Sequence, residues 1–211
     1  MAHILVIGAS RGIGLETVKA ALAAGHRVRA FARSASSLGI SAPELERFAG
    51  DARNSGDIAA ALDGIDAVVQ ALGVSVTELF DPVRLFSDAT NVLVPAMEKA
   101  GVRRLLAITG FGAGDSRDAI SILQRVPFEL VFGRIYDDKD AQEMRIRRSE
   151  LDWTLVRPGV LTSGTKTGRY RALDEPSSWR GGLISRADVA DFIVEHLDDA
   201  TYLLRAVVLV A

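Results

Sequence analysis

The chain has 211 residues, of which 48% are hydrophobic, 25 are basic, 27 are acidic and none is cysteine. This length and composition predict a single domain with a full hydrophobic core. The balanced charge carries no basic stripe of the kind that binds nucleic acid or a membrane surface. The lack of cysteine excludes disulfides and thiolate chemistry.

The polar residues and the N-terminus narrow the class of protein further. His3, His26 and His196 lie far apart in the sequence and lack metal-ligand spacing, so we expect no metal site. The first residues enter a strand pattern without the basic segment that opens a signal peptide, and no apolar run is long enough to span a bilayer. These features predict a cytoplasmic protein that binds neither membranes nor nucleic acid.

Short apolar runs rich in valine, isoleucine and leucine predict strands that are covered on both faces. In chain order they are residues 3–8, 27–33, 66–73, 103–110, 152–159 and 205–211, with a weaker run at 45–50. Helical spacing of apolar residues separates the strands at residues 15–25, 81–101, 137–150 and 185–199. Pro95 should bend or interrupt the second of these helices, and Ser185 is the expected N-cap of the last.

The alternation of strands and helices predicts an α/β fold with a doubly wound parallel sheet over residues 1–211. Two segments, 110–135 and 160–184, interrupt this alternation just after strand ends. Ligands bind at that edge of the sheet in such folds. We therefore expect the two segments to form a small lobe that faces the substrate, although their sequences carry no readable motif.

The glycine-rich turn GASRGIG, residues 8–14, lies between the first strand and the first helix. In that position a glycine turn brings backbone N–H groups and the positive end of a helix onto a dinucleotide pyrophosphate. A nucleophile elbow around Ser10 is the alternative, but it would leave Gly14 unexplained and would need a partnered histidine and acid. A purely structural turn is the remaining alternative. The expected pyrophosphate site comprises Gly8, Ser10, Arg11, Gly12, Ile13 and Gly14.

The end of the second strand indicates which dinucleotide would bind. An NAD site usually has an acidic residue there, whereas this chain has Arg33 followed by Ser34. An arginine and a hydroxyl attract a 2′-phosphate, and Arg11 could approach from the other side, so the sequence favours NADP(H). The alternative is that both arginines simply face solvent. Asp51 and Ala52, after the third strand, would suit the adenine amino group, unless Asp51 is an ordinary turn residue.

These residues resemble the short-chain dehydrogenase/reductase superfamily, in its atypical branch of small NAD(P)H-binding proteins. That branch includes flavin reductases, biliverdin reductases and the NADP-sensing relatives of nitrogen-metabolite regulators. The motifs that carry the resemblance run nearly from end to end. They are GASRGIG (8–14), FARS (31–34), GDAR (50–53), QALG (70–73), GVRRLLAITGFGAG (101–114), LDWTLVRPG (151–159) and SRADVADFI (185–193). The resemblance implies a Rossmann-type NAD(P)-binding domain.

The resemblance also implies roles for single residues. Thr109 falls where the superfamily has a serine or threonine near the nicotinamide and the substrate oxygen, and Lys139 falls where it has a lysine that binds the nicotinamide ribose. Two loops would line the cofactor: Ala71, Leu72 and Gly73 after the fourth strand, and Pro158, Gly159 and Val160 beside the nicotinamide.

One departure concerns the tyrosine that usually stands four residues before this lysine and donates a proton. Position 135 is Ile135, and Tyr136 precedes Lys139 by only three residues. Donation by a lysine-activated tyrosine is therefore in doubt, although Tyr136 could lie just before the helix and still reach the site. Flavin-type acceptors in this branch need no such tyrosine, because solvent can supply the proton.

Three functions follow as hypotheses. The first is an NADPH-dependent reductase that transfers a hydride to a planar small molecule, such as a flavin, a quinone or a conjugated carbonyl compound, with Thr109 orienting it. The second is an NADP(H) sensor without turnover, which the altered tyrosine spacing favours. The third, an epimerase or dehydratase, usually needs the tyrosine and a larger C-terminal domain. The sequence does not indicate an oligomeric state.

Two further features of the sequence have two interpretations each, as a ligand contact or as an ordinary structural element. The glycines of residues 110–116 would allow either the close approach of a flat ligand or a mobile loop. Trp179 would either stack on a substrate ring or pack within the lobe.

Overall fold

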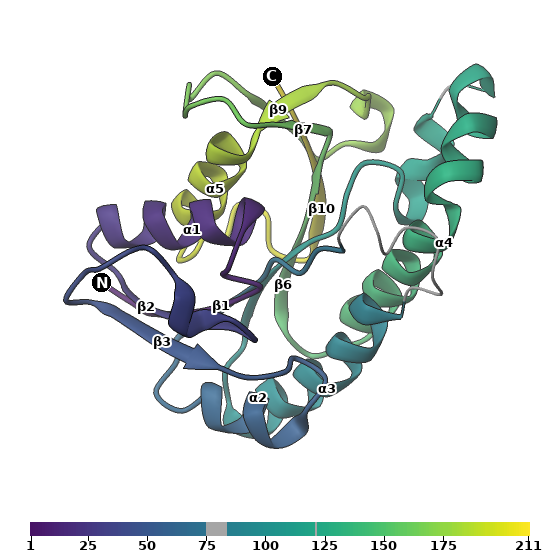
Figure 1. The fold of residues 1–211 in the computed structure, drawn as a ribbon. Helices are drawn as coiled ribbons and strands as arrows, with labels where there is room; N and C mark the ends of the chain where they lie inside the picture. The colour runs from purple at the N-terminus through teal and green to yellow at the C-terminus, as the bar shows by residue number, and fades with distance from the viewer. Residues whose placement is uncertain (75–83, 121) are drawn as a thin grey trace.

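The computed structural model describes residues 1–74, 84–120 and 122–211, and for residues 122–132 it describes the backbone alone. Eight strands form one sheet in the order β3-β2-β1-β4-β5-β6-β10-β8, and among them β8 alone runs antiparallel to its neighbour (Figure 1). The strands are β1 (His3–Ile7), β2 (Arg27–Ala32), β3 (Leu45–Ala49), β4 (Ala67–Gln70), β5 (Arg104–Ile108), β6 (Asp152–Pro158), β8 (Arg171–Leu173) and β10 (Arg205–Val210).

All seven predicted strands are confirmed, including the weaker run at 45–50, which forms β3 at the edge of the sheet. The order 3-2-1-4-5-6 is that of a doubly wound Rossmann-type sheet, so the predicted fold class is also confirmed. In this order the chain leaves β1 toward one side of the sheet and β4 continues on the other. That reversal opens a crevice at the carboxyl ends of the strands, where the glycine turn lies.

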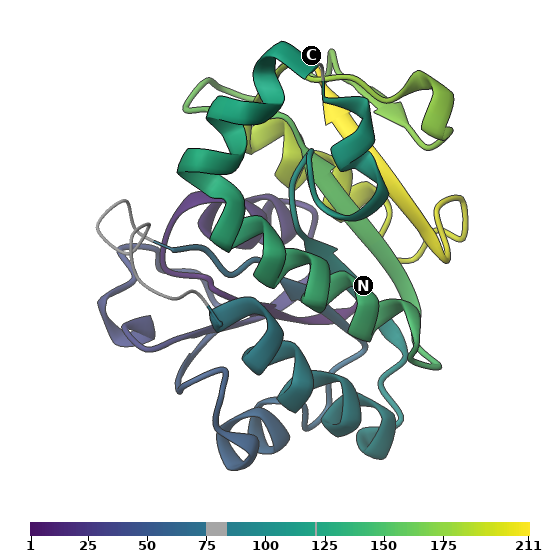
Figure 2. The same cartoon turned by 90° about the vertical axis from the view of Figure 1, so that its right-hand side faces the viewer.

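Helices cover both faces of the sheet (Figures 1 and 2). One face carries α1 (Gly12–Ala23) and α5 (Arg186–Glu195), and the other carries α2 (Ser55–Ala61), α3 (Leu85–Ala100) and α4 (Ile122–Arg147). Successive strand residues alternate between the two hydrophobic cores, so that Ile4 and Val6 of β1 pack under α1 and α5 while Leu5 and Ile7 pack under α2 and α3. Both faces are therefore covered, which explains why the strands lack polar alternation.

The helices differ from the prediction in three places. The helix expected at 137–150 already begins at Ile122. Its first half was not predicted, because Pro127 and Gly133 obscure the helical pattern there. The short helix α2 was not predicted; it begins after Asn54, whose side chain accepts hydrogen bonds from the backbone N–H groups of Gly56 and Asp57. The third difference is in α3, which continues through Pro95 without interruption. The expected first residues of that helix, 81–83, lie outside the described residues.

The two segments expected to form a lobe contain short elements. Residues 110–120 end in a 3₁₀ turn (Gly114–Ala119), and residues 122–135 belong to α4, whose side chains are described only from residue 133 onward. The second segment contains β8 and the pair β7 (Val160–Thr162) and β9 (Leu183–Ser185), which form a separate two-stranded parallel sheet. That the two segments act as a substrate-facing lobe stays a prediction. Within the described ranges, every helix is too short or too polar to cross a bilayer.

Candidate functional site

A cleft of about 1070 Å³ lies at the carboxyl ends of β1 to β6. It brings together most of the residues that the sequence singled out, although they come from seven separate segments of the chain. These are Gly8, Ser10, Arg11, Gly12, Ile13, Arg33, Ser34, Asp51, Ala52, Ala71, Leu72, Gly73, Thr109, Tyr136, Lys139 and Pro158. We call this hollow the strand-end cleft.

The glycine turn forms one wall of the strand-end cleft. Gly8 has a φ of +89°, and a Cβ built on it would lie 2.5 Å from the carbonyl oxygen of Ala71. Gly14 does not line the cleft; its Cβ would lie 2.2 Å from the carbonyl oxygen of Gly8, so its role is to let α1 pack against the turn. Gly12 has a φ of +61° and open space where a Cβ would stand, which leaves its backbone accessible from the cleft.

The N-terminus of α1 opens at the same place. Arg11 is the N-cap residue and makes no capping hydrogen bond through its side chain, and the first turn of α1 has no acidic residue. The backbone N–H groups of the first turn and the positive end of the helix dipole are therefore available to an anion. A diphosphate fits this cradle. The alternative of a nucleophilic Ser10 gains no support, because none of the three histidines lines the cleft.

The adenosine end of the cleft is more basic than the sequence indicated. Arg33 and Ser34 are exposed on the cleft, as a contact with a 2′-phosphate requires. The side chain of Arg53, which the prediction missed, also lines the cleft and donates hydrogen bonds of 3.2 and 3.0 Å to the carboxylate of Asp51. These bonds hold the pKa of Asp51 below its ordinary value. In this structure Asp51 therefore binds Arg53. The only sign of Arg53 in the sequence was its place as the last residue of the GDAR motif.

At the opposite end of the cleft, Thr109 directly follows β5 and is held at three points. Its backbone N–H donates to the carbonyl oxygen of Val156 at 2.9 Å, its carbonyl oxygen accepts from Lys139 Nζ at 2.5 Å, and its hydroxyl donates to Glu143 Oε1 at 2.8 Å. Lys139 and Glu143 stand four residues apart on α4, and therefore on one face of the helix. That face fixes the position and direction of Thr109.

Lys139 is a buried ammonium group. Its Nζ lies 4.3 Å from the centre of the Phe86 ring, and its side chain lines the strand-end cleft. Burial lowers the pKa of Lys139 from 10.5 to about 8, although the negative charges of Glu143 and Asp138 partly oppose this effect. The structure thus contains a cation that titrates not far above neutral pH.

Behind Thr109 lies a buried ion pair that sequence analysis missed. Arg157 is fully buried and donates to both carboxylate oxygens of Glu143, at 2.9 and 2.5 Å. Its guanidinium also lies 2.6 Å from Asp115 and 5.0 Å from the centre of the Trp179 ring. Trp179 therefore packs on Arg157 rather than in the cleft, as the second of its two interpretations stated. Arg157 was visible only as the arginine of LDWTLVRPG.

Tyr136 lies inside α4, not before it, and it lines the cleft together with Lys139 and Ile135. Burial raises the pKa of Tyr136 to about 12. A Cβ on Gly110 would come within 2.8 Å of the Tyr136 hydroxyl, and a Cβ on Gly114 within 2.6 Å of Arg157. Gly110 and Gly114 thus make room for side chains of the protein itself.

Pro158 lines the cleft but the next two residues do not. Gly159 packs so closely on Gly182 that a Cβ would stand 2.3 Å from its carbonyl oxygen, and the backbone N–H of Val160 donates to the same oxygen at 2.8 Å. Gly159 and Val160 are therefore engaged with the β9 side of the chain and do not line the cleft, and their place beside the nicotinamide stays a prediction.

Comparison with known proteins gives one family match. A family model described as NAD(P)H-binding matches residues 8–200. The UPF0659 protein YMR090W of Saccharomyces cerevisiae is 31% identical over 143 residues, which cover 67% of this chain and 60% of the relative. The 3-beta-hydroxysteroid dehydrogenase of Mycolicibacterium neoaurum is 31% identical over 153 residues, which cover 65% of this chain and 40% of that protein.

A solved structure matches over almost the whole length of both chains. It is ChuY from Escherichia coli O157:H7, described as an anaerobillin reductase, with 26% sequence identity and a TM-score of 0.80. The match covers 99% of this chain and 96% of that one. The two curated relatives are longer, so the chain spans at most 60% of their length.

Proposed function

The chain belongs to the NAD(P)H-binding family, and on that premise we propose that it is an NADPH-dependent reductase acting on a planar small molecule. The observation that supports this proposal is the continuity of the strand-end cleft. It runs from Arg33, past the open backbone of Gly12, to Lys139 and Thr109. A dinucleotide needs an anion site and a reaction site joined in this way.

Each end of the cleft has a role in binding. The N-terminus of α1 at Gly12 would hold the pyrophosphate, and Arg33 with Ser34 would hold the 2′-phosphate that distinguishes NADPH from NADH. Lys139 would bind the nicotinamide ribose, as in the superfamily that the sequence resembles. The bound cofactor supplies a hydride from its nicotinamide ring. The chain contributes the binding, the orientation and the exclusion of water.

The acceptor is proposed from the surface beside Thr109. Four apolar side chains line the cleft there: those of Leu85, Phe86, Ile135 and Leu161. Apolar side chains with few polar groups suit a flat conjugated ring. ChuY, which is described as an anaerobillin reductase, supports an extended conjugated acceptor. Flavins, quinones and conjugated carbonyl compounds share this shape.

One observation favours a second function, an NADP(H) sensor without turnover. Lys139 donates its hydrogen bond to the carbonyl oxygen of Thr109, and the pKa of Tyr136 is raised rather than lowered. A lysine-activated tyrosine would have a lowered pKa, so the raised pKa of Tyr136 supports a function that does not need one. A protein that only reports the NADPH level would need no proton donor.

Two measurements separate these functions. Isothermal titration calorimetry with NADPH and NADH tests binding, and loss of the nicotinamide absorbance at 340 nm tests turnover on flavins, quinones and conjugated carbonyl compounds. We expect tight NADPH binding and oxidation with at least one acceptor. Binding without oxidation on the whole panel would favour the sensor, whereas an absence of binding would refute both functions.

A further inference from the structure

The cleft offers three side chains near the reaction position that carry an O–H or N–H group: Thr109, Tyr136 and Lys139. A reduced conjugated acceptor needs a proton as well as a hydride, so it matters which of them can give one. The structure gives each of them a different environment. This comparison rests on the proposed reductase function.

Thr109 is not the donor. Its hydroxyl hydrogen is directed at Glu143 Oε1, and the same carboxylate accepts two hydrogen bonds from Arg157. A guanidinium is always protonated and only donates, so the carboxylate opposite it only accepts. The hydroxyl hydrogen of Thr109 is therefore committed to Glu143 and is not available to a ligand.

Lys139 keeps a proton for the cleft. An ammonium group has three N–H bonds. Within the described part of the chain, one of them donates to the Thr109 carbonyl oxygen, and the face of the Phe86 ring covers another side of the group. The third N–H has no described partner, and the side chain lines the cleft, where a ligand would meet it.

Tyr136 is the weaker acid of the remaining two. Burial raises the pKa of its hydroxyl to about 12, whereas burial lowers the pKa of Lys139 to about 8. A proton donor works best when its pKa lies near the working pH, and that condition favours the lysine. The two groups lie three residues apart on α4, so both can face the same ligand.

We propose that Lys139, and not Tyr136, gives the proton to the reduced acceptor, and that Glu143 is the positioning residue for this step. When the acceptor takes a hydride at carbon, the displaced electron pair comes to rest on its conjugated oxygen or nitrogen. That atom then forms a bond with a proton as the Nζ–H bond of Lys139 breaks. The neutral amine takes a proton from solvent before the next turnover.

Glu143 acts on Lys139 in two ways. It holds Thr109, whose carbonyl oxygen fixes the ammonium, and its negative charge favours the protonated amine. The other charged group facing Lys139 is Asp138, which also accepts hydrogen bonds from the first backbone N–H groups of α3. From β6, Arg157 faces Glu143 and partly neutralises it. Loss of the Glu143 charge should therefore make Lys139 a stronger acid.

The chain has only four lysines, and the other three, Lys19, Lys99 and Lys166, are exposed. Carbon-13 labelling at the lysine ε-carbon thus gives four NMR signals, and the signal lost in Lys139→Arg identifies Lys139. We expect Lys139 to titrate near pH 8, well below the exposed lysines, in the protein without cofactor. A Lys139 signal that titrates together with the exposed lysines would overturn the proposal.

Glu143→Gln keeps the shape of the side chain and removes its charge. We expect the Lys139 midpoint to move to lower pH in this variant and to return in Glu143→Asp. An unchanged midpoint would reduce Glu143 to a structural role. If Glu143→Gln does not fold because Arg157 loses its counter-ion, the pair variant Glu143→Gln with Arg157→Gln is compared with Arg157→Gln alone, because the difference between those two midpoints isolates the charge of Glu143.

The pH dependence of kcat then identifies which group donates the proton. In the wild type, kcat should be constant below the Lys139 midpoint and fall as the pH rises through it, because only the protonated amine donates. Lys139→Arg keeps the positive charge but holds its proton too tightly, so kcat should drop about a hundredfold and the fall near pH 8 should disappear. Because the arginine keeps a cationic N–H donor for the nicotinamide ribose, the KM for NADPH should change less than kcat. Tyr136→Phe should keep the wild-type profile.

The outcomes distinguish this inference from the function on which it rests. If Lys139→Arg retains the wild-type rate and profile, solvent or Tyr136 supplies the proton, and the reductase function still stands. A large loss of kcat in Tyr136→Phe would likewise overturn the proposed role of Lys139 and leave the reductase function standing. If none of the acceptors tested supports NADPH oxidation by the wild type, the reductase function itself is refuted, whatever the NMR titration shows.

Discussion

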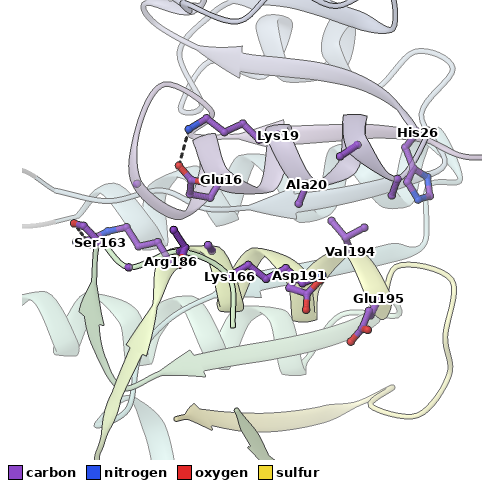
Figure 3. Close-up of a pocket in the computed structure, with 16 residues that line it drawn as sticks. Glu16, Lys19, Ala20, His26, Ser163, Lys166, Arg186, Asp191, Val194 and Glu195 are labelled. Atoms are coloured by element: carbon purple, nitrogen blue, oxygen red, sulfur yellow. Dashed lines mark hydrogen bonds and ion pairs between the residues drawn. The ribbon is translucent and has the colours of Figure 1, made fainter. Parts of the chain in front are cut away.

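Two hollows of almost equal size lie in the described part of the molecule, and the groups that line them differ. The strand-end cleft has a volume of about 1070 Å³, and a groove between α1 and α5 has about 1100 Å³ (Figure 3). We call the second hollow the α1–α5 groove. The two meet at Gly12 and Arg186, which line both. Volume therefore does not distinguish them.

The α1–α5 groove is lined by charges that neutralise one another at the surface. Lys19 pairs with Glu16 at 2.8 Å on α1, and Lys166 pairs with Asp191 at 2.5 Å (Figure 3). Arg186 donates to the carbonyl oxygen of Thr162 at 2.9 Å. Exposed pairs of this kind contribute little to stability and leave no strong group directed at a ligand.

The strand-end cleft also has an exposed ion pair, Arg53 with Asp51, but it differs because it adds buried and uncapped polar groups. Lys139 and Glu143 are almost fully buried, and the first turn of α1 presents backbone N–H groups that no side chain caps. Burial of a charge is costly, so a fold that keeps one beside an open cleft has a use for it. The two hollows are therefore distinguished by the cost of the groups that line them and not by the size of the space, and this cost is what favours the strand-end cleft as the candidate site.

The largest expected effect tests the open backbone of the cleft. Gly12→Ala would place a methyl group where a diphosphate is proposed to lie, so NADPH affinity measured by calorimetry should fall roughly a hundredfold, the equivalent of one or two charge-assisted hydrogen bonds. Gly25→Ala is the matched control, because Gly25 also has a positive φ, of +83°, and open space around its Cβ. It should share the backbone strain and keep full affinity. Equal losses in both variants would contradict the phosphate site.

Most of the fold could be predicted from the sequence because buried parallel strands are continuous apolar runs. The β1 to β6 runs and β10 were found for this reason. What failed was local: α2 is only seven residues long, and Pro127 and Gly133 obscure the first half of α4. The strands β7, β8 and β9 have three residues each, which is too short for any periodicity to appear.

The glycine turn and Arg33 could be predicted because their meaning depends on position along the chain. Glu143 could not, because its role exists only when α4 packs against the end of β6 and brings it to Arg157. In the sequence it is one acid among many on a polar helix. Arg53 was missed for a similar reason, since only the fold shows that the turn carrying Arg53 and Asp51 lines the cleft.

The second prediction tests the buried charge of Lys139 against an exposed lysine of the groove. Unfolded chain keeps the lysine proton up to about pH 10.5, whereas the folded protein loses it near pH 8. The unfolded state therefore binds more protons between these values, and stability rises with pH. Relative to Lys139→Met, the free energy of unfolding of the wild type should rise by about 2 kcal/mol from pH 8 to pH 10.

Urea denaturation at pH 8, 9 and 10 measures this difference, and Lys166→Met is its control. The carboxylate of Asp191 raises the pKa of Lys166, so that lysine stays protonated in both states over this window. Its variant should follow the wild-type pH dependence. Above pH 10 the stability of the wild type and of both variants should fall, because Tyr136 ionises near pH 10 in the unfolded chain but holds its proton to about pH 12 in the folded protein. Parallel curves for the wild type and Lys139→Met would show that Lys139 is not a buried cation.

The smallest expected effect concerns the choice between NADPH and NADH. Arg33 is exposed, so water screens its attraction for a 2′-phosphate, and Arg33→Asp should weaken NADPH binding by only about tenfold while leaving NADH binding unchanged. Lys166→Asp makes the same change of net charge in the α1–α5 groove and should affect neither nucleotide. A similar loss of NADPH affinity in both variants would mean that overall charge, not contact with Arg33, sets the preference. A loss confined to Arg33→Asp, but equal for both nucleotides, would move this arginine from the 2′-phosphate to the pyrophosphate.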